Sequence, residues 1–402
     1  MAARQSINPF KGIAGNVVTL GFVSFFTDVS GEMIFPLLPL FLTATLGAGA
    51  AFLGVIEGFA ESLSAFLQLG VGILSDRVKD RSRWVLGGYA LSSVFRPLVA
   101  FATAPWMVLA VRLTDRTGKG IRTAPRDSLI ADSVAPAHRG KAFGFHRGMD
   151  HAGAVVGPLI ASLILAFFTK DLRKVFLLAA VPAAVAVGLI LWRVRELPGR
   201  VSAAAAPSAR LAPPSGKLRV YLAILFVFLL SNSSDAFLLL RLTDLGIPAA
   251  AVPLLWTALH VVKASTTMPL GTLSDRLGRR KVILAGWLIY AAIYAAFGWV
   301  HHPAAIAALF VAYGLYYGFT EGTEGALMAD LAPGGERGKA FGWYNFVIGT
   351  AILPANLLFG LLWQRGGPRT AFTVSAILSL SAAVLLFLFI RRIPSARTAS
   401  AD

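Results

Sequence analysis

Five basic residues share one face of a predicted helix that spans 105–131. They are spaced four, three, three and four residues apart: Arg112, Arg116, Lys119, Arg122 and Arg126. At about 100° per residue they fall within an arc of about 120°. Each cation costs roughly 2.5–3.5 kcal/mol at the centre of a membrane helix, so such a face must meet water, carboxylates or an anionic solute. We therefore expect it to line a polar cavity or to face the protein interior.

Four acidic residues occupy apolar segments nearer the N-terminus, in two pairs. Asp28 and Glu32 are four residues apart, as are Glu57 and Glu61. Residues at this spacing share a helical face, so both pairs can meet the basic face of 105–131. Buried ion pairs hardly offset their own desolvation, and so many charges in one half indicate a wet cavity. A carboxylate there can exchange a proton, with Asp28 as first candidate and Glu32 as second.

A short stretch of the predicted helix 141–168 carries four more ionisable residues. His146 and Asp150 are four residues apart, as are Arg147 and His151. Histidine exchanges protons in the physiological range, so His146 and Asp150 are further candidates for carrying a proton. The alternative is that these side chains satisfy one another as packing residues.

The second half of the chain places acids where the first half has cations. Asp235 is the acid of segment 219–241, and Glu324 follows Arg126 by 198 residues. A cavity with a basic wall and an acidic wall suits a zwitterionic or polyanionic solute. The predicted substrate contacts are Arg112, Arg116, Arg126, Glu57, Glu61, Asp235 and Glu324. Aromatic residues of this half can stack on a ligand or serve in packing: Trp256, Tyr313, Tyr316, Tyr317, Trp343 and Tyr344.

The composition places these charges in a membrane protein. Of 402 residues, 56% are hydrophobic and 14% are charged, and the mean hydropathy is +0.70. Several runs approach the roughly 20 apolar residues that span a bilayer. Cysteine is absent, which excludes disulfides and thiolate chemistry. The first apolar run contains Asp28 and Glu32 and is too long for a signal peptide.

Apolar runs between breakers predict an all-α membrane protein with twelve transmembrane helices in two six-helix bundles. The bundles cover 1–192 and 219–402, joined by a cytoplasmic linker at 193–218 that is rich in alanine, proline and basic residues. The helices are expected near 15–42, 51–74, 84–103, 105–131, 141–168, 173–192, 219–241, 249–273, 281–300, 303–328, 339–363 and 370–391.

The basic residues predict the orientation. With both termini in the cytoplasm, most of the 37 Lys and Arg residues fall in cytoplasmic segments, as is typical of membrane proteins. The opposite face holds Lys170, Arg173, Lys174, Arg365 and Arg369. The net charge of +17 therefore reflects topology rather than nucleic-acid binding.

Three motifs recur in the same order at an almost constant offset, which indicates an internal duplication. Residues 72–77 recur at 271–276, residues 131–132 at 329–330, and residues 139–144 at 337–342, with offsets of 199, 198 and 198. Parallel repeats of a six-helix unit imply a pseudo-two-fold axis along the membrane normal, with a cavity between the halves.

The loop at 271–281, G-T-L-S-D-R-L-G-R-R-K, resembles the signature loop of the major facilitator superfamily, G-x-x-x-D-R-x-G-R-R. The first copy keeps Gly72, Asp76 and Arg77 and then departs from the pattern. The resemblance implies two halves that rock about a central site, with this loop latching the cytoplasmic side. It assigns gating to Asp76, Arg77, Asp275 and Arg276, and flanking arginines are expected to pair with acids on adjacent helices. The alternative is that these charges only set topology.

Residues 153–162, G-A-V-V-G-P-L-I-A-S, give a second resemblance, to the antiporter motif G-x-x-x-G-P-x-x-G-G of proton-linked exporters. Small residues at this spacing let two helices approach closely, and Pro158 permits a kink. We expect Gly157 and Pro158 to act in gating. The motif favours export by antiport.

We therefore expect a proton-coupled secondary transporter of a small organic solute that works by alternating access in a bacterial inner membrane. The alternative is an importer or exchanger of an anionic metabolite or a polycarboxylate chelate. The sequence contains no P-loop and no hydrolase or zinc-enzyme motif, so no enzyme activity, cofactor or metal is expected. The expected partners are the solute, protons and the lipid bilayer, with no nucleic acid, and the chain is expected to be a monomer.

Overall fold

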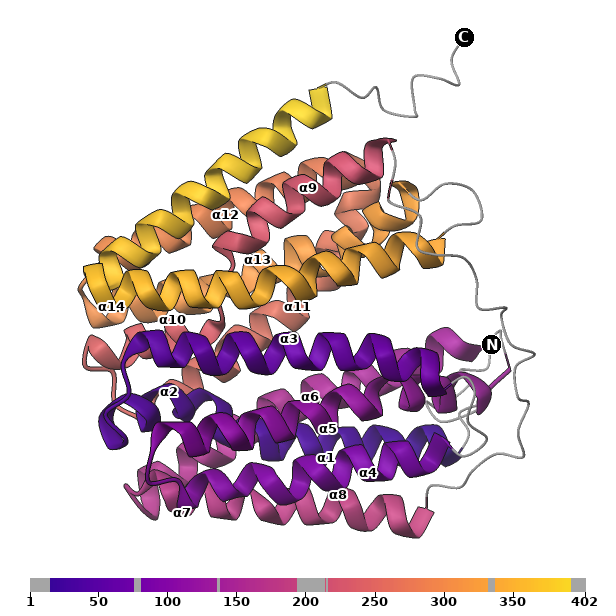
Figure 1. The fold of residues 1–402 in the computed structure, drawn as a ribbon, viewed down its shortest axis with the longest axis vertical. Coiled ribbons are helices and arrows are strands. Elements are labelled where there is room, and N and C mark those ends of the chain that lie inside the picture. The colour runs from indigo at the N-terminus through magenta and orange to yellow at the C-terminus, as the bar shows by residue number, and fades with distance from the viewer. Residues whose placement is uncertain are drawn as a thin grey trace, which may run out of the picture.

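The computed structural model describes residues 15–75, 81–135, 138–193, 214, 216–331 and 337–391. Helices account for nearly all of these residues, and no strand occurs in these ranges. The helices lie side by side as two groups, one from each half of the chain (Figure 1). Asp76, Arg77 and most of the predicted linker lie outside the described residues. The predicted all-α class is confirmed.

The first half contains α1 to α8, which follow the predicted segments. Pro36 and Pro39 interrupt the first segment, because proline lacks the N–H that continues an α-helix. Short 3-10 and π-helical turns therefore follow α1. The elements are α1 (Gly15–Ile34), η1 (Phe35–Leu37), α2 (Leu38–Leu40), η2 (Phe41–Thr45), α3 (Ala50–Ser75), α4 (Arg81–Phe95), η3 (Arg96–Phe101), α5 (Pro105–Asp132), α6 (Arg139–Phe167), α7 (Leu172–Leu178) and α8 (Ala180–Arg193).

The second half contains α9 to α14. The predicted helix 219–241 is broken at Asn232–Ser234, where the Ser234 hydroxyl caps α10 by accepting a hydrogen bond from the Ala236 N–H. Two predicted helices run together as α14, which bends at Gly367 (φ 76°). The elements are α9 (Gly216–Ser231), α10 (Asp235–Asp244), α11 (Val252–Leu277), α12 (Arg279–Trp299), α13 (Pro303–Leu331) and α14 (Arg337–Arg391).

Within the described ranges, nine helices are long and apolar enough to cross a membrane. Two more, α5 and α11, have the length but are more polar, and α14 joins two crossings at Gly367. The helices are therefore consistent with the twelve predicted crossings.

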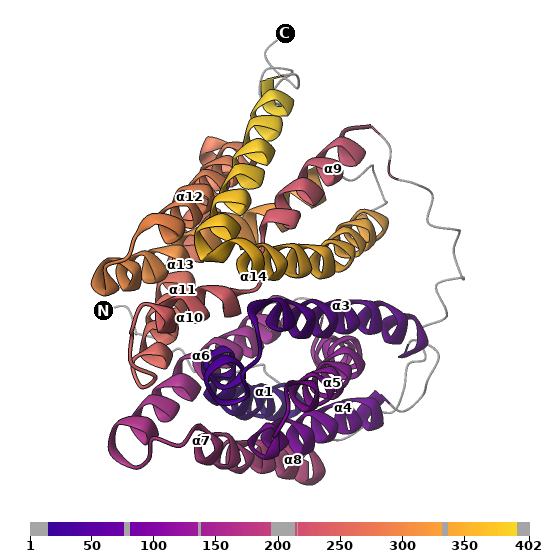
Figure 2. The same ribbon diagram turned by 60° about the vertical axis from the view of Figure 1, so that its left-hand side comes forward.

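The two groups of helices meet along two seams. α3 packs on α14 at one seam, and α6 packs on α11 at the other (Figure 2). Glycines permit close contact at the first seam. A Cβ on Gly54 would lie 2.3 Å from the Asn356 carbonyl oxygen, and a Cβ on Gly360 would lie 2.8 Å from that of Ala50. These two contacts fix the positions of α3, α6, α11 and α14 on either side of the space between the halves.

The internal duplication extends to side-chain packing. A Cβ on Gly88 would lie 2.7 Å from the Arg122 Cβ, and a Cβ on Gly286 would lie 2.8 Å from Thr320 Cγ2. Gly286 and Thr320 each follow their counterparts by 198 residues. Equivalent positions of α4 and α5 can therefore be compared with those of α12 and α13 at this offset.

Candidate functional site

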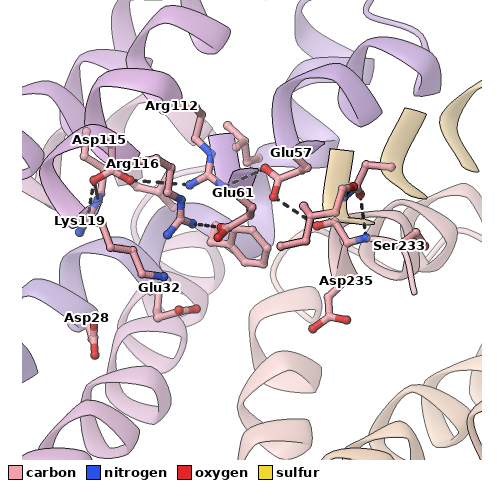
Figure 3. Close-up of a pocket in the computed structure, with 18 of the residues that line it drawn as sticks. Asp28, Glu32, Glu57, Glu61, Arg112, Asp115, Arg116, Lys119, Ser233 and Asp235 are labelled. Carbon is pink, nitrogen blue, oxygen red and sulfur yellow. Dashed lines mark hydrogen bonds and ion pairs between the residues drawn. The ribbon is translucent and has the colours of Figure 1, made fainter. Parts of the chain in front are cut away.

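A cavity of about 460 Å³ lies between the two halves. Its walls come from α1, α3, η3 and α5 on one side and from α9, α10, α11, α13 and α14 on the other. The breaks after α1 and α9 both contribute, through Phe35 and through Asn232–Ser234. Interrupted helices expose backbone and capping groups that a continuous helix would cover. Figure 3 shows charged side chains converging on this space from both sides.

Four of the five predicted cations of α5 line the cavity: Arg112, Arg116, Lys119 and Arg122. The expectation that this helical face meets a polar interior is confirmed. Arg126 does not line the cavity and pairs with Asp127 at 2.9 Å instead.

The acids of α3 pair with the cations of α5, as expected from their spacing. Arg112 Nη2 lies 2.8 Å from Glu57 Oε1, and Arg116 Nη2 lies 3.0 Å from Glu61 Oε1 (Figure 3). The Glu57 side chain is 1% exposed and that of Glu61 is 32% exposed. The inner pair is therefore strongly desolvated, and the second reaches water or a solute.

Arg96 and Asp115 belong to the same network and were not among the predicted site residues. Arg96 donates to Asp115 Oδ1 through Nη2 at 2.8 Å and to the Thr27 carbonyl oxygen through Nη1 at 2.8 Å. Asp115 also lies 3.8 Å from Arg112 Nη1. Arg96 stands beside Pro97 inside an apolar segment, and a lone cation in such a segment is the signal that identifies it.

Asp28 and Glu32 both line the cavity from α1. Glu32 Oε2 accepts a hydrogen bond from Trp256 Nε1 of the other half at 2.7 Å. No hydrogen bond or ion pair joins the Asp28 carboxylate to another described side chain. The Glu32 carboxylate therefore has a hydrogen-bond donor, whereas the Asp28 carboxylate has none among the described side chains.

The glycine motif of α6 lies directly behind these acids. A Cβ on Gly153 would lie 2.6 Å from the Phe25 carbonyl oxygen and 2.9 Å from the Asp28 Cβ. A Cβ on Gly157 would lie 2.6 Å from the Val29 carbonyl oxygen and 3.0 Å from the Glu32 Cβ. The motif therefore sets how far α1 projects toward the cavity, and Pro158 follows inside α6.

Asp235 lines the cavity from the second half and is held by phenol groups. The hydroxyls of Tyr317 and Tyr313 donate to its carboxylate at 2.7 Å and 3.1 Å. Trp256 and Tyr317 are the predicted aromatic residues that reach the cavity, whereas Tyr313 and Tyr316 pack against Tyr290.

Glu324 lies away from the residues that line the cavity. Its carboxylate accepts hydrogen bonds from Trp287 Nε1 at 3.3 Å and from the Tyr344 hydroxyl at 3.0 Å. In the part of the chain that the structure describes, Glu324 has no cationic partner. His146 and Asp150 also lie outside the cavity lining, with His146 Nδ1 3.5 Å from Asp150 Oδ2.

The loop motif of the second half makes the expected ion pairs. Arg279 begins α12 and contacts Asp330 of α13 at 2.8 Å and Asp275 of α11 at 3.5 Å. Arg81 contacts Asp132 at 2.7 Å in the first half. Arg276 is exposed. The predicted pairing of flanking arginines with acids on adjacent helices is confirmed at both places.

Among the described side chains, no three metal-ligating groups gather in a way that could hold a metal ion. The polar groups of the cavity are carboxylates, guanidinium groups, an ammonium group, hydroxyls and amides. They can bind a charged solute and exchange protons.

Comparison with known proteins agrees with this arrangement. The family model described as Major Facilitator Superfamily matches residues 20–240 and 220–402. An uncharacterised MFS-type transporter of Methanocaldococcus jannaschii is 32% identical over 384 residues, which cover 94% of this chain and 96% of the relative. Multidrug resistance protein MdtH of Photorhabdus laumondii is 30% identical over 156 residues, or 37% of this chain and 38% of that protein.

A solved structure of the nucleoside transporter NupG has the same fold, with a TM-score of 0.76 at 14% identity, over 93% of this chain and 99% of that one. The chain belongs to the major facilitator superfamily. It is a multi-pass membrane transporter and not an enzyme.

Proposed function

We propose that this chain is a proton-coupled secondary transporter of a small organic solute. The observation that carries the proposal is the charged cavity between the two halves, into which Asp28 projects without a bonded partner. A carboxylate in such a place can hold or release a proton as its surroundings change. Glu32, His146 and Asp150 are the other candidates for this step.

The solute would bind between the bundles 1–192 and 219–402, which would rock about it while 193–218 links them. Arg112, Arg116, Glu57, Glu61 and Asp235 are proposed contacts. Arg126 and Glu324 remain predicted contacts that would need a conformation with a wider cavity. Asp76, Arg77, Asp275, Arg276, Gly157 and Pro158 are proposed to act in gating.

Two hydrogen bonds between the halves support a gate on one side of the cavity. Trp256 donates to Glu32 at 2.7 Å, and the Ser234 hydroxyl donates to Glu57 Oε2 at 3.2 Å. Both carboxylates therefore belong to the cavity and to the contact between the halves. A proton or a solute that competes for them would weaken that contact, which couples binding to opening.

We favour export by antiport, in the inner membrane of a bacterium, by a monomer with both termini in the cytoplasm. The motif at 153–162 and the partial similarity to multidrug resistance protein MdtH support export. Import or exchange of an anionic solute is the second candidate. It is supported by Lys119 and Arg122, which line the cavity with no carboxylate within ion-pair distance among the described residues.

The test is proton-driven flux in proteoliposomes that carry an internal pH dye. Solutes are screened for those that dissipate an imposed pH gradient only when the protein is present. Asp28→Asn should abolish the solute-dependent proton flux and leave solute exchange partly intact, because Asn keeps the size but cannot titrate. If Asp28→Asn keeps full proton coupling, the proton must be carried by Glu32, His146 or Asp150 instead. If the solute flux of the wild type does not respond to a pH gradient, proton coupling is refuted.

A further inference from the structure

Most charges in the cavity are already paired within the first half. Arg112 is paired with Glu57, Arg116 with Glu61, and Arg96 with Asp115. These six groups neutralise one another, so together they add no net charge to the wall of the cavity. A solute that competes for them would have to break ion pairs between helices that pack closely.

Two cations are left over on α5, and both line the cavity. Lys119 is partly exposed and forms no ion pair with a described residue. Arg122 is buried, donates to the Ser92 hydroxyl at 2.7 Å and lies over the Tyr89 ring at 4.5 Å. Neither has a carboxylate partner within the described ranges. This part of the cavity therefore presents two cations that no direct ion pair neutralises, although Asp28 and Glu32 line the same wall.

An acid that forms no ion pair with a described residue faces the cavity from the other half. The carboxylate of Asp235 receives only hydroxyl groups, from Tyr313 and Tyr317, and the group is partly exposed. Figure 3 shows Asp235 and Lys119 on opposite sides of the cavity. The aromatic rings of Trp256, Phe35 and Tyr317 line the space as well.

We propose that the solute is a zwitterion with an aromatic or apolar body. This inference rests on the proposed function and specifies its substrate class. The cationic end binds Asp235, and the anionic end binds Lys119, with Arg122 behind it. Charge-assisted hydrogen bonds at both ends compensate groups that are costly to leave unpaired in a desolvated site. Asp28 stays free to carry a proton.

A zwitterion also has a mechanical advantage over a singly charged solute. Lys119 belongs to the first half and Asp235 to the second, so a zwitterion spans both bundles. A ligand shifts a conformational equilibrium only by its difference in affinity for the two states. The affinity for a solute that contacts both halves depends on the distance between them, whereas the affinity for a solute bound at one end does not.

The test uses three matched aromatic probes that differ only in their charges. They are para-(aminomethyl)benzoate, which is a zwitterion, para-toluate, which lacks the ammonium group, and para-methylbenzylamine, which lacks the carboxylate. Binding to the purified full-length protein is measured by the ligand-dependent shift of thermal unfolding and by isothermal titration. We expect the zwitterion to bind at least about tenfold more tightly than either singly charged probe.

Two variants separate the ends of the site. Lys119→Gln should bind the zwitterion and para-methylbenzylamine equally, and Asp235→Asn should bind the zwitterion and para-toluate equally. Lys217→Gln and Asp244→Asn change exposed residues of α9 and α10 and should keep the wild-type preference. Lys119→Arg and Asp235→Glu should restore part of the preference, which distinguishes charge recognition from loss of folding.

Equal binding of all three probes by the wild type, or binding of none, would overturn the inference. A wild-type preference for a singly charged probe would do the same and would leave the transporter assignment standing. Failure of the proposed function gives a different result. If Asp28→Asn keeps full proton coupling, the proposed proton site is wrong even when the preference for the zwitterion is intact.

Discussion

The two halves place different polar chemistry on equivalent helices. At the offset of 198, three ionisable groups near the cavity in the first half correspond to tyrosines in the second. The correspondences are Arg96 with Tyr294, Asp115 with Tyr313 and Lys119 with Tyr317. The same offset relates Tyr89 to Trp287, Arg126 to Glu324 and His146 to Tyr344.

The difference changes how each half satisfies its buried charges. In the first half, acids and cations neutralise each other across α3, η3 and α5. In the second half, Asp235 and Glu324 receive hydrogen bonds from neutral phenol and indole groups. An ion pair depends on both charges, and losing one leaves the other costly. A neutral donor tolerates a change in the charge of its acceptor much better, so the second half is better suited to exchanging charge with a solute.

The largest expected effect comes from breaking the inner ion pair of the first half. Glu57→Leu leaves Arg112 buried with Asp115 at 3.8 Å as its remaining acidic contact. Removal of one partner from a buried pair costs about 3–5 kcal/mol. We expect a large fall in the thermal unfolding midpoint and loss of flux.

Glu61→Leu is the matched control, since Glu61 also pairs with an α5 arginine but is one-third exposed. Its cost should be at most about 1 kcal/mol. Equal destabilisation by both variants would contradict the idea that desolvation makes the inner pair critical.

The next effect concerns the hydroxyl donors of the second half. Tyr317→Phe removes the 2.7 Å hydrogen bond to Asp235, and a hydrogen bond to a charged acceptor is worth about 1.5–3 kcal/mol. The same substitution in an Asp235→Asn background should cost clearly less. A double-mutant cycle on the midpoints of thermal unfolding measures the difference, and identical costs would show that Asp235 does not depend on this donor.

A smaller effect is expected where the halves differ in glycine content. Gly153 and Gly157 of α6 correspond to Ala351 and Ala355 of α14 at the offset of 198. Gly157→Ala would place a Cβ 2.6 Å from the Val29 carbonyl oxygen, so α1 must move, at a cost of about 1–3 kcal/mol. The displacement should also weaken coupling, because Glu32 and Asp28 lie on the same helix.

Gly148→Ala tests the same helix at a place where nothing lies within 4 Å of an added Cβ. It should not lower the unfolding midpoint, because alanine is more favourable than glycine inside a helix, and it should leave the flux unchanged. If Gly157→Ala behaves like Gly148→Ala in both assays, the close approach of α1 and α6 does not matter for coupling.

The smallest effect should come from the loop pairs that both halves share. Arg279→Asp breaks the contacts with Asp330 and Asp275, and the side chains of these acids are more than half exposed. The loss in stability should be about 0.2–1 kcal/mol. The double variant Arg279→Asp/Asp330→Arg restores the ion pair with its charges reversed and should recover the flux of the wild type. If the flux is not recovered, Arg279 has a role beyond this ion pair.

The membrane class, the helices, the duplication and the basic face of α5 could all be predicted from the sequence. Each depends on local properties of the chain, namely the length of apolar runs, the 3.6-residue period and motifs at a constant offset. The pairing of Glu57 and Glu61 with α5 also followed from spacing, since a basic face in a membrane has few alternatives. The gating roles of Asp76 and Arg77 stay predictions, because these residues lie outside the described part of the chain.

Only the tertiary structure decided which charges are neutralised and which remain. Arg96 and Asp115 join the network because α4 and α5 approach closely at Gly88 and Gly118, a distance no sequence period encodes. Glu32 meets Trp256 across the halves, 224 residues away. Periodicity tells which side chains share a face but not which helix that face meets, so Arg126 and Glu324 share the cavity's helices without reaching the cavity. The packing of the helices, rather than the order of their residues, leaves Lys119 and Asp235 on opposite walls without an ion pair among the described residues.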